Sequence, residues 1–139
     1  MLQIESVDHV QLPVPYGGLP AARAFYQGLL GLVEVRDPVL DRLGTLRFSL
    51  GWQRLDLSEG SYTGVAPPAH LALRVQQVGV VAQRLAAAGQ RIDVDPLAGG
   101  TPRLYVEDPF GNRLELIEPE GSRQDLSIAR HVTEFQLSV

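Results

Sequence analysis

Apolar and polar positions follow the same order in two successive segments of the chain, which indicates an internal repeat. Each segment begins with an alternating run that predicts a strand, 7–12 in the first and 69–75 in the second. Apolar residues at helical spacing come next, and Gly31 or Gly89 then supplies the left-handed residue that ends a helix. The matched positions lie about sixty residues apart, so the chain contains two copies of one unit.

The second part of each segment predicts three further strands. They are 33–36, 46–50 and 54–57 in the first segment and 91–94, 104–107 and 113–116 in the second. The stretch Asp108-Pro109-Phe110-Gly111 has the residue preferences of a type I turn between two strands. We therefore predict an α+β fold with two tandem βαβββ modules, at 5–59 and 66–119. Both lie in one domain over 1–139, which ends in a tail at 120–139.

One face of four predicted strands is apolar, and the opposite face carries histidine, arginine and carboxylate side chains. His9 and His70 take equivalent positions on the first strands, and Asp56 and Glu115 take equivalent positions on the last strands. If the modules pack with approximate two-fold symmetry, two imidazoles and two carboxylates converge, and these ligands suit a divalent transition metal. The alternative for the same pattern is an ordinary antiparallel sheet with one face in water.

Composition removes several classes of function. Cysteine is absent, which excludes disulfide scaffolds, thiolate metal sites and thiol nucleophiles. The net charge is −4 with no basic tract, so we expect no nucleic-acid partner. No apolar run is long enough to span a membrane, and no signal-peptide pattern opens the sequence. These features predict a cytoplasmic protein without a membrane partner.

Three motifs together resemble the vicinal oxygen chelate superfamily, which includes glyoxalase I, bleomycin-resistance proteins and extradiol dioxygenases. The first motif covers residues 8–12 and 22–32, and the second covers 70–75. The third is the tyrosine-bearing stretch 105–116, which ends in Arg-Leu-Glu-Leu. The resemblance implies a partly open, eight-stranded barrel around one divalent metal ion, which could be nickel, zinc, manganese or iron. Carried over by position, the ligands are His9, His70 and Glu115. Asp56 stands where glyoxalase-like members usually have a glutamate ligand.

The first functional prediction is a metal-dependent lyase or isomerase of glyoxalase type, in which the ion chelates two substrate oxygens as a Lewis acid. Asp56 and Glu115 are the candidate catalytic carboxylates. The alternatives are a dimeric bleomycin-resistance-type protein that sequesters a small molecule, and an Fe(II) dioxygenase. We also expect a homodimer, because open sheet edges invite closure. The predicted substrate pocket contains Gln11, Trp52, Arg74, Tyr105 and Phe110.

Overall fold

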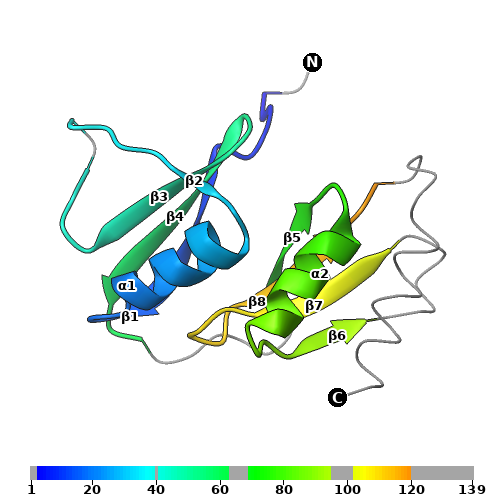
Figure 1. The fold of residues 1–139 in the computed structure, drawn as a ribbon. Helices are drawn as coiled ribbons and strands as arrows, with labels where there is room; N and C mark the ends of the chain where they lie inside the picture. The colour runs from blue at the N-terminus through cyan, green and yellow to red at the C-terminus, as the bar shows by residue number, and fades with distance from the viewer. Residues whose placement is uncertain (1–2, 40, 63–68, 95–101, 120–139) are drawn as a thin grey trace. The chain divides into compact units, whose positions relative to one another are not determined.

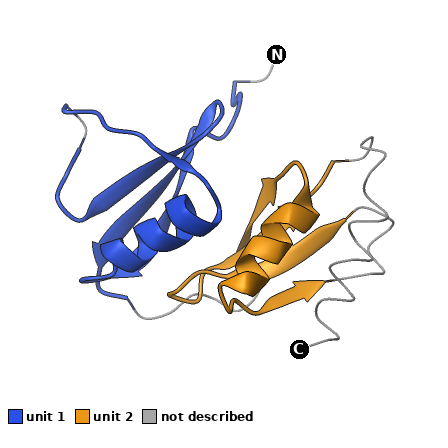
Figure 2. Ribbon diagram, in the orientation of Figure 1, with its two compact units in different colours: residues 1–64 blue, residues 65–139 orange. Residues whose placement is uncertain are grey.

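Each half of the chain forms a four-stranded mixed sheet with a helical segment against one face (Figure 1). The computed structural model describes residues 3–39, 41–62, 69–94 and 102–119. The chain divides into two compact units, Met1–Gly64 (unit 1) and Val65–Val139 (unit 2), as Figure 2 shows. Each unit contains one βαβββ module, so the predicted α+β class and the repeat are confirmed.

Unit 1 has its strands in the order β1-β4-β3-β2, with β1 parallel to β4 and the other pairs antiparallel. Its elements are β1 His9–Pro15, α1 Leu19–Arg23, a π-helix at Ala24–Leu29, β2 Val33–Glu34, β3 Thr45–Leu50 and β4 Gln53–Gly60. Strand β1 extends through Pro13 and Pro15. It tolerates both prolines because it lies at the edge of its sheet, where backbone donors on one side have no strand to pair with.

The helix predicted in unit 1 is present, but its second part is a π-helix rather than an α-helix. The wider turn is closed by a hydrogen bond from the Leu30 N–H to the Phe25 carbonyl, five residues back, at 3.0 Å. Widening reduces the angle between consecutive side chains. Phe25 and Tyr26 can therefore both be buried, and the Tyr26 ring lies 5.9 Å from the ring of Phe48 on β3.

Unit 2 repeats this topology with the strand order β5-β8-β7-β6. Its elements are β5 His70–Arg74, α2 Val78–Ala87, β6 Ile92–Val94, β7 Arg103–Glu107 and β8 Arg113–Ile117. Strand β5 is parallel to β8. Helix α2 is followed by Gly89 at φ +78°, the left-handed conformation that the sequence predicts there.

The two cores confirm which strand faces are apolar. In unit 1 the helical segment packs on the apolar face of β3 and β4, and in unit 2 helix α2 packs on β6 and β7. The buried apolar side chains of the units are Val14, Ala22, Phe25, Tyr26, Leu46, Phe48, Leu55 and Leu57, and Val78, Ala82, Leu85, Ile92, Leu104, Val106, Leu114 and Leu116. Each sheet therefore has one buried apolar face, and its polar side chains gather on the other.

The turn between β7 and β8 shows why its sequence is so specific. The Gly111 N–H donates to the Asp108 carbonyl at 3.2 Å, which closes the predicted type I turn. The buried Asp108 carboxylate accepts the backbone N–H groups of Phe110 and Asn112, at 2.9 and 2.8 Å, and the Asn112 side-chain amide at 2.7 Å. Asp108 and Asn112 thus fix the turn that leads into β8 and its carboxylate.

A second pair of equivalent carboxylates anchors the starts of the two helical segments. Glu59, at the end of β4, accepts the Gly17 N–H at 3.0 Å, just before α1. Glu118, just after β8, is buried and accepts the Val78 N–H at the first residue of α2, also at 3.0 Å. Each carboxylate satisfies an amide at a helix N-terminus, where negative charge is favourable.

Candidate metal centre

Asp56 and Glu115 lie on the central strands of their sheets, on the face opposite the core leucines. The register places Gln11 beside Asp56 in unit 1 and Ala72 beside Glu115 in unit 2. Both carboxylates are 5 % exposed. A buried carboxylate requires compensating partners, so the contacts of each one indicate what it does.

In unit 2, the two oxygens of Glu115 have different partners. Oε1 accepts hydrogen bonds from Arg103 Nη1 at 3.0 Å and from the Tyr105 hydroxyl at 3.2 Å, both on the neighbouring strand β7. Oε2 lies 3.1 Å from Nε2 of His70 on β5. The structure thus brings together His70, Glu115 and Tyr105, which the sequence selects independently.

Tyr105 is the centre of this group. Its hydroxyl contacts Glu115, its ring meets the His70 ring edge-on with the centroids 6.0 Å apart, and the Arg113 guanidinium lies 4.3 Å from its centroid. An arginine at this distance over a tyrosine face makes a favourable cation–π contact. Tyr105 therefore connects the imidazole, the carboxylate and a cationic side chain.

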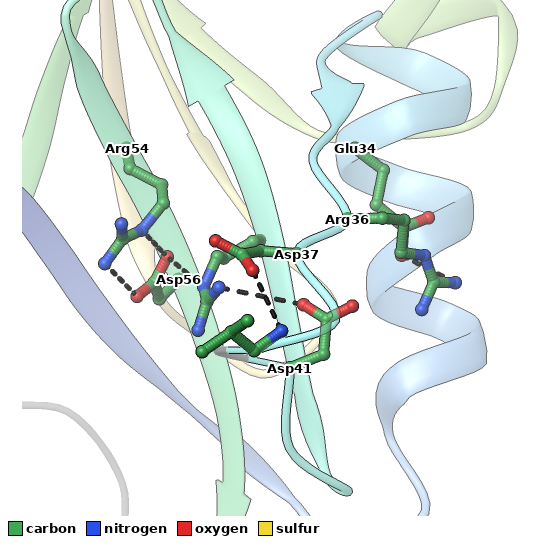
Figure 3. A network of polar contacts seen from close by, with 8 residues as sticks. Glu34, Arg36, Asp37, Asp41, Arg54 and Asp56 are labelled. Carbon is green, nitrogen blue, oxygen red and sulfur yellow. Dashed lines mark hydrogen bonds and ion pairs between the residues drawn. The ribbon is translucent and has the colours of Figure 1, made fainter.

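In unit 1, the equivalent carboxylate of Asp56 is paired with arginine instead of histidine (Figure 3). Arg54 binds both oxygens of Asp56, through Nε at 2.7 Å and Nη2 at 3.1 Å. Arg47 Nε lies 3.9 Å from the same carboxylate, and Arg47 Nη1 lies 3.7 Å from Asp41. The hydrogen bonds to Asp56 raise the pKa of Arg54 above its ordinary value. Asp56 thus belongs to a structural ion-pair network.

His9, on the exposed face of β1, has a different partner from its counterpart His70. Its Nδ1 lies 2.8 Å from Oδ2 of Asp8, and this hydrogen bond holds the pKa of the exposed Asp8 carboxyl below its usual range. A histidine that donates through one ring nitrogen to a carboxylate presents the other nitrogen as an acceptor or metal ligand.

The other predicted pocket residues lie on different elements, Gln11 and Trp52 in unit 1 and Arg74 and Phe110 in unit 2. Gln11 and Arg74 are exposed on edge strands, and Trp52 is fully exposed in the turn between β3 and β4. Phe110 lies half-buried in the turn before β8. A groove of about 600 Å³ in unit 2 includes Tyr105, and its lining is Ala69, Gln90, Arg91, Asp93, Tyr105, Val106, Glu107, Asp108, Gly111 and Arg113.

Sequence reasoning missed Arg103, Asp8 and the helix-anchoring glutamates. Arg103 was detectable in principle, because it stands two residues before Tyr105 and so on the same strand face. Glu59 and Glu118 show the same spacing as Asp56 and Glu115, so the repeat itself carried a signal for them. Asp8 directly precedes His9, and adjacency alone does not indicate a hydrogen bond.

The model of the Glyoxalase/Bleomycin resistance protein/Dioxygenase superfamily matches residues 6–116. The chain belongs to this superfamily. A crystal structure of a glyoxalase family protein from Bacillus anthracis is 33 % identical, with a TM-score of 0.78 over 86 % of this chain and 99 % of that one. Among curated protein sequences, no significant match to the chain was found.

More distant glyoxalase-superfamily structures share the fold. Lactoylglutathione lyase from Agrobacterium tumefaciens is 21 % identical, with a TM-score of 0.66 over 84 % of this chain and 96 % of that one. The fosfomycin resistance protein FosX from Listeria monocytogenes is 22 % identical, with a TM-score of 0.68 over 88 % of this chain and 98 % of that one. In the described part of the chain, no helix is both long and apolar enough to cross a membrane.

The His70–Glu115 pair fits half of a glyoxalase-superfamily metal site. Two ligands that each lie about 2.1 Å from a metal ion and subtend a right angle are about 3 Å apart, close to the 3.1 Å between Nε2 and Oε2. Arg103 and Tyr105 contact Oε1 with hydrogen bonds of the kind that orient metal-binding carboxylates in proteins. Asp56 fits poorly, because Arg54 already binds both of its oxygens. Among residues 3–39, 41–62, 69–94 and 102–119, no three metal-ligating side chains form one cluster.

Proposed function

We propose that this protein is a metal-dependent enzyme that acts on a small molecule, a lyase or isomerase of glyoxalase type with one divalent ion per site. The observation that carries the proposal is the His70–Glu115 pair, with the second carboxylate oxygen held by Arg103 and Tyr105. Superfamily membership supports it. So does a FosX mutant from L. monocytogenes, whose crystal structure is a complex with Mn(II) and dihydroxypropylphosphonic acid.

The roles follow from the contacts. His70 and Glu115 would hold the ion, and in unit 1 the contact of Asp8 with Nδ1 of His9 leaves the other ring nitrogen of His9 available as an acceptor or ligand. The bound ion would supply Lewis-acid chemistry to substrate oxygens. Arg103 and the Tyr105 hydroxyl hold the Glu115 carboxylate in a fixed orientation through hydrogen bonds to Oε1. We propose that the unit 2 groove beside Tyr105 takes the part of the substrate remote from the reacting oxygens.

We propose a structural role for Asp56. A metal ion at this carboxylate would compete with its hydrogen bonds to Arg54, and charge-assisted bidentate pairs are among the strongest in proteins. Asp56 is therefore a weaker candidate for a catalytic base or a ligand than its position in the repeat suggests.

The test is metal-dependent turnover. Protein stripped with a chelator and reloaded with Ni, Zn, Mn or Fe is screened with hemithioacetals, acyl-CoA epimers, fosfomycin and catechols. We expect turnover of one class, lost on stripping, restored by a particular ion and abolished in His70→Ala. The exposed helix variant Gln83→Ala is the control and keeps full activity. Turnover that survives both stripping and His70→Ala would overturn the proposal, and iron-specific turnover of a catechol would favour a dioxygenase.

The second candidate is a protein that sequesters a small molecule without a metal. It is favoured by the closed network around Glu115, whose charge Arg103 already balances and whose Oε2 has a hydrogen-bond partner in His70. For this candidate, calorimetry detects tight binding of fosfomycin or an aromatic drug. That binding persists unchanged in His70→Ala and after chelation, and no substrate class is turned over.

We propose further that the protein is a homodimer with two-fold symmetry. Each sheet has two edge strands, β1 and β2 in unit 1 and β5 and β6 in unit 2, and unpaired edges favour association. Sedimentation at micromolar concentration should give twice the mass of one chain. A species with the mass of a single chain at that concentration would contradict this proposal and leave the metal site untouched.

A further inference from the structure

Each repeat places an arginine two residues before its carboxylate on the same strand face, yet the two arginines turn in different directions. Arg54 and Arg113 occupy equivalent positions, opposite His9 and His70 respectively. Arg54 turns along its strand and binds both oxygens of Asp56. Arg113 turns across the sheet and lies over the Tyr105 ring, on the strand where Glu107 is its register partner.

The residue across the sheet explains the difference. Arg47 lies opposite Asp56 in unit 1, and Tyr105 lies opposite Glu115 in unit 2. Arg47 carries the same charge as Arg54 and repels it, so Arg54 pairs with the Asp56 carboxylate. Tyr105 offers Arg113 an aromatic face at 4.3 Å, an alternative that the planar guanidinium can occupy. The units differ at a second position as well, because Ser49 lies opposite Arg54 whereas Glu107 lies opposite Arg113. The Tyr105 ring is nevertheless the neighbour over which the Arg113 guanidinium lies.

We propose that Tyr105 is a positioning residue whose ring holds Arg113 away from Glu115 and thereby keeps Glu115 Oε2 accessible to His70 and a metal ion. Without the ring, Arg113 would bind Glu115 as Arg54 binds Asp56. A guanidinium there would compete with a divalent cation for the same oxygen, by occupancy and by like charge. The metal part of this inference rests on the proposed function, whereas the direction that Arg113 takes does not.

Two Tyr105 variants separate the ring from the hydroxyl. Tyr105→Phe keeps the face under Arg113 and loses only the 3.2 Å hydrogen bond to Glu115. Tyr105→Leu removes the face. In calorimetric titrations with Mn(II), we expect Tyr105→Phe to stay within about threefold of the wild-type affinity. Tyr105→Leu should lose affinity by about tenfold or more, which is the effect typical of removing a residue that orients a metal ligand.

The deciding variant is Tyr105→Leu with Arg113→Ala. It is expected to recover most of the lost Mn(II) affinity, because no arginine remains to bind Glu115. Arg113→Ala alone is the matched control and should bind Mn(II) like the wild type. If the double variant binds Mn(II) no better than Tyr105→Leu, the ring does not act through Arg113 and the inference is wrong. Tyr105→Val, a better strand former, replaces Tyr105→Leu if the latter does not fold.

A double-mutant cycle in the presence of chelator tests the same point without metal. The cycle combines Arg113→Ala with Glu115→Gln and measures unfolding in urea, once with Tyr105 and once with Leu at this position. We expect no coupling between positions 113 and 115 in the wild-type background. In the Tyr105→Leu background we expect a coupling of about threefold or more in the unfolding equilibrium constant. Equal coupling in both backgrounds would overturn the inference, and wild-type protein that binds no metal would overturn only the proposed function.

Discussion

The two units share one topology and place a carboxylate at the same position of the same strand, but they surround it with different chemistry. In unit 1, both oxygens of Asp56 are bound by Arg54, with Arg47 close by. In unit 2, Glu115 has one oxygen held by Arg103 and Tyr105 and the other against His70. The repeated fold therefore places both carboxylates at the same position, and the neighbouring side chains determine which groups each carboxylate contacts.

The largest expected stability effect comes from the two equivalent arginines. Arg54→Met leaves the buried Asp56 without its bidentate partner and should lower the free energy of unfolding by about 2 kcal/mol, less than for a fully buried pair because Arg54 is 29 % exposed. Arg113→Met removes one cation–π contact and should cost about 0.5 kcal/mol. Urea unfolding measures both. Equal losses would show that the two arginines do not differ as the contacts suggest.

A smaller effect separates the helix-anchoring glutamates. Glu118→Gln should destabilise the protein by about 1 to 2 kcal/mol, because the buried carboxylate lies at the N-terminus of α2 and accepts the Val78 N–H. Glu59→Gln should cost about 0.5 kcal/mol, since its hydrogen bond to Gly17 is exposed to solvent. Thermal unfolding compares the two variants, and a larger loss for Glu59→Gln would contradict the assignment.

The smallest effect concerns Asp8, the partner of His9. Its pKa is lower in the folded protein than the ordinary 3.8, chiefly because of the hydrogen bond with His9. A depressed carboxyl pKa stabilises the fold above the ordinary value, and this contribution is lost as the pH falls through the folded value. Asp8→Asn should therefore lower the melting temperature slightly at neutral pH, and the difference should fade below pH 3.8. A difference that grew in acid would have the wrong sign.

Much of the fold could be predicted because strands and helices have different periodicities of apolar residues. The same order of strands and helix also occurs twice in the sequence. The equivalent positions of His9 and His70, and of Asp56 and Glu115, follow from that repeat, and the structure places His70 and Glu115 in contact. The π-helix at Ala24–Leu29 could not be predicted, because a segment of 6 residues is too short for its apolar spacing to distinguish the two helix types.

The partners of the carboxylates were harder to predict than their positions. Arg54 and Arg113 have the same spacing from their carboxylates, so sequence alone does not say that only Arg54 binds one. The neighbours of each guanidinium on the adjacent strand, Arg47 near Arg54 and Tyr105 under Arg113, are known only once the strand register is known. Which of two neighbours a side chain contacts depends on the relative energies of the two contacts, and the local sequence pattern does not show these energies.

We propose that Glu115, and not its repeat counterpart Asp56, is the carboxylate available to a divalent ion. Calorimetric titration of chelator-treated protein with Mn(II) tests it with the matched isosteric variants Glu115→Gln and Asp56→Asn, each confirmed as folded by circular dichroism. We predict that Glu115→Gln weakens Mn(II) binding by about 100-fold or more, whereas Asp56→Asn remains within about threefold of the wild type. A loss of binding in Asp56→Asn as large as that in Glu115→Gln would contradict the account.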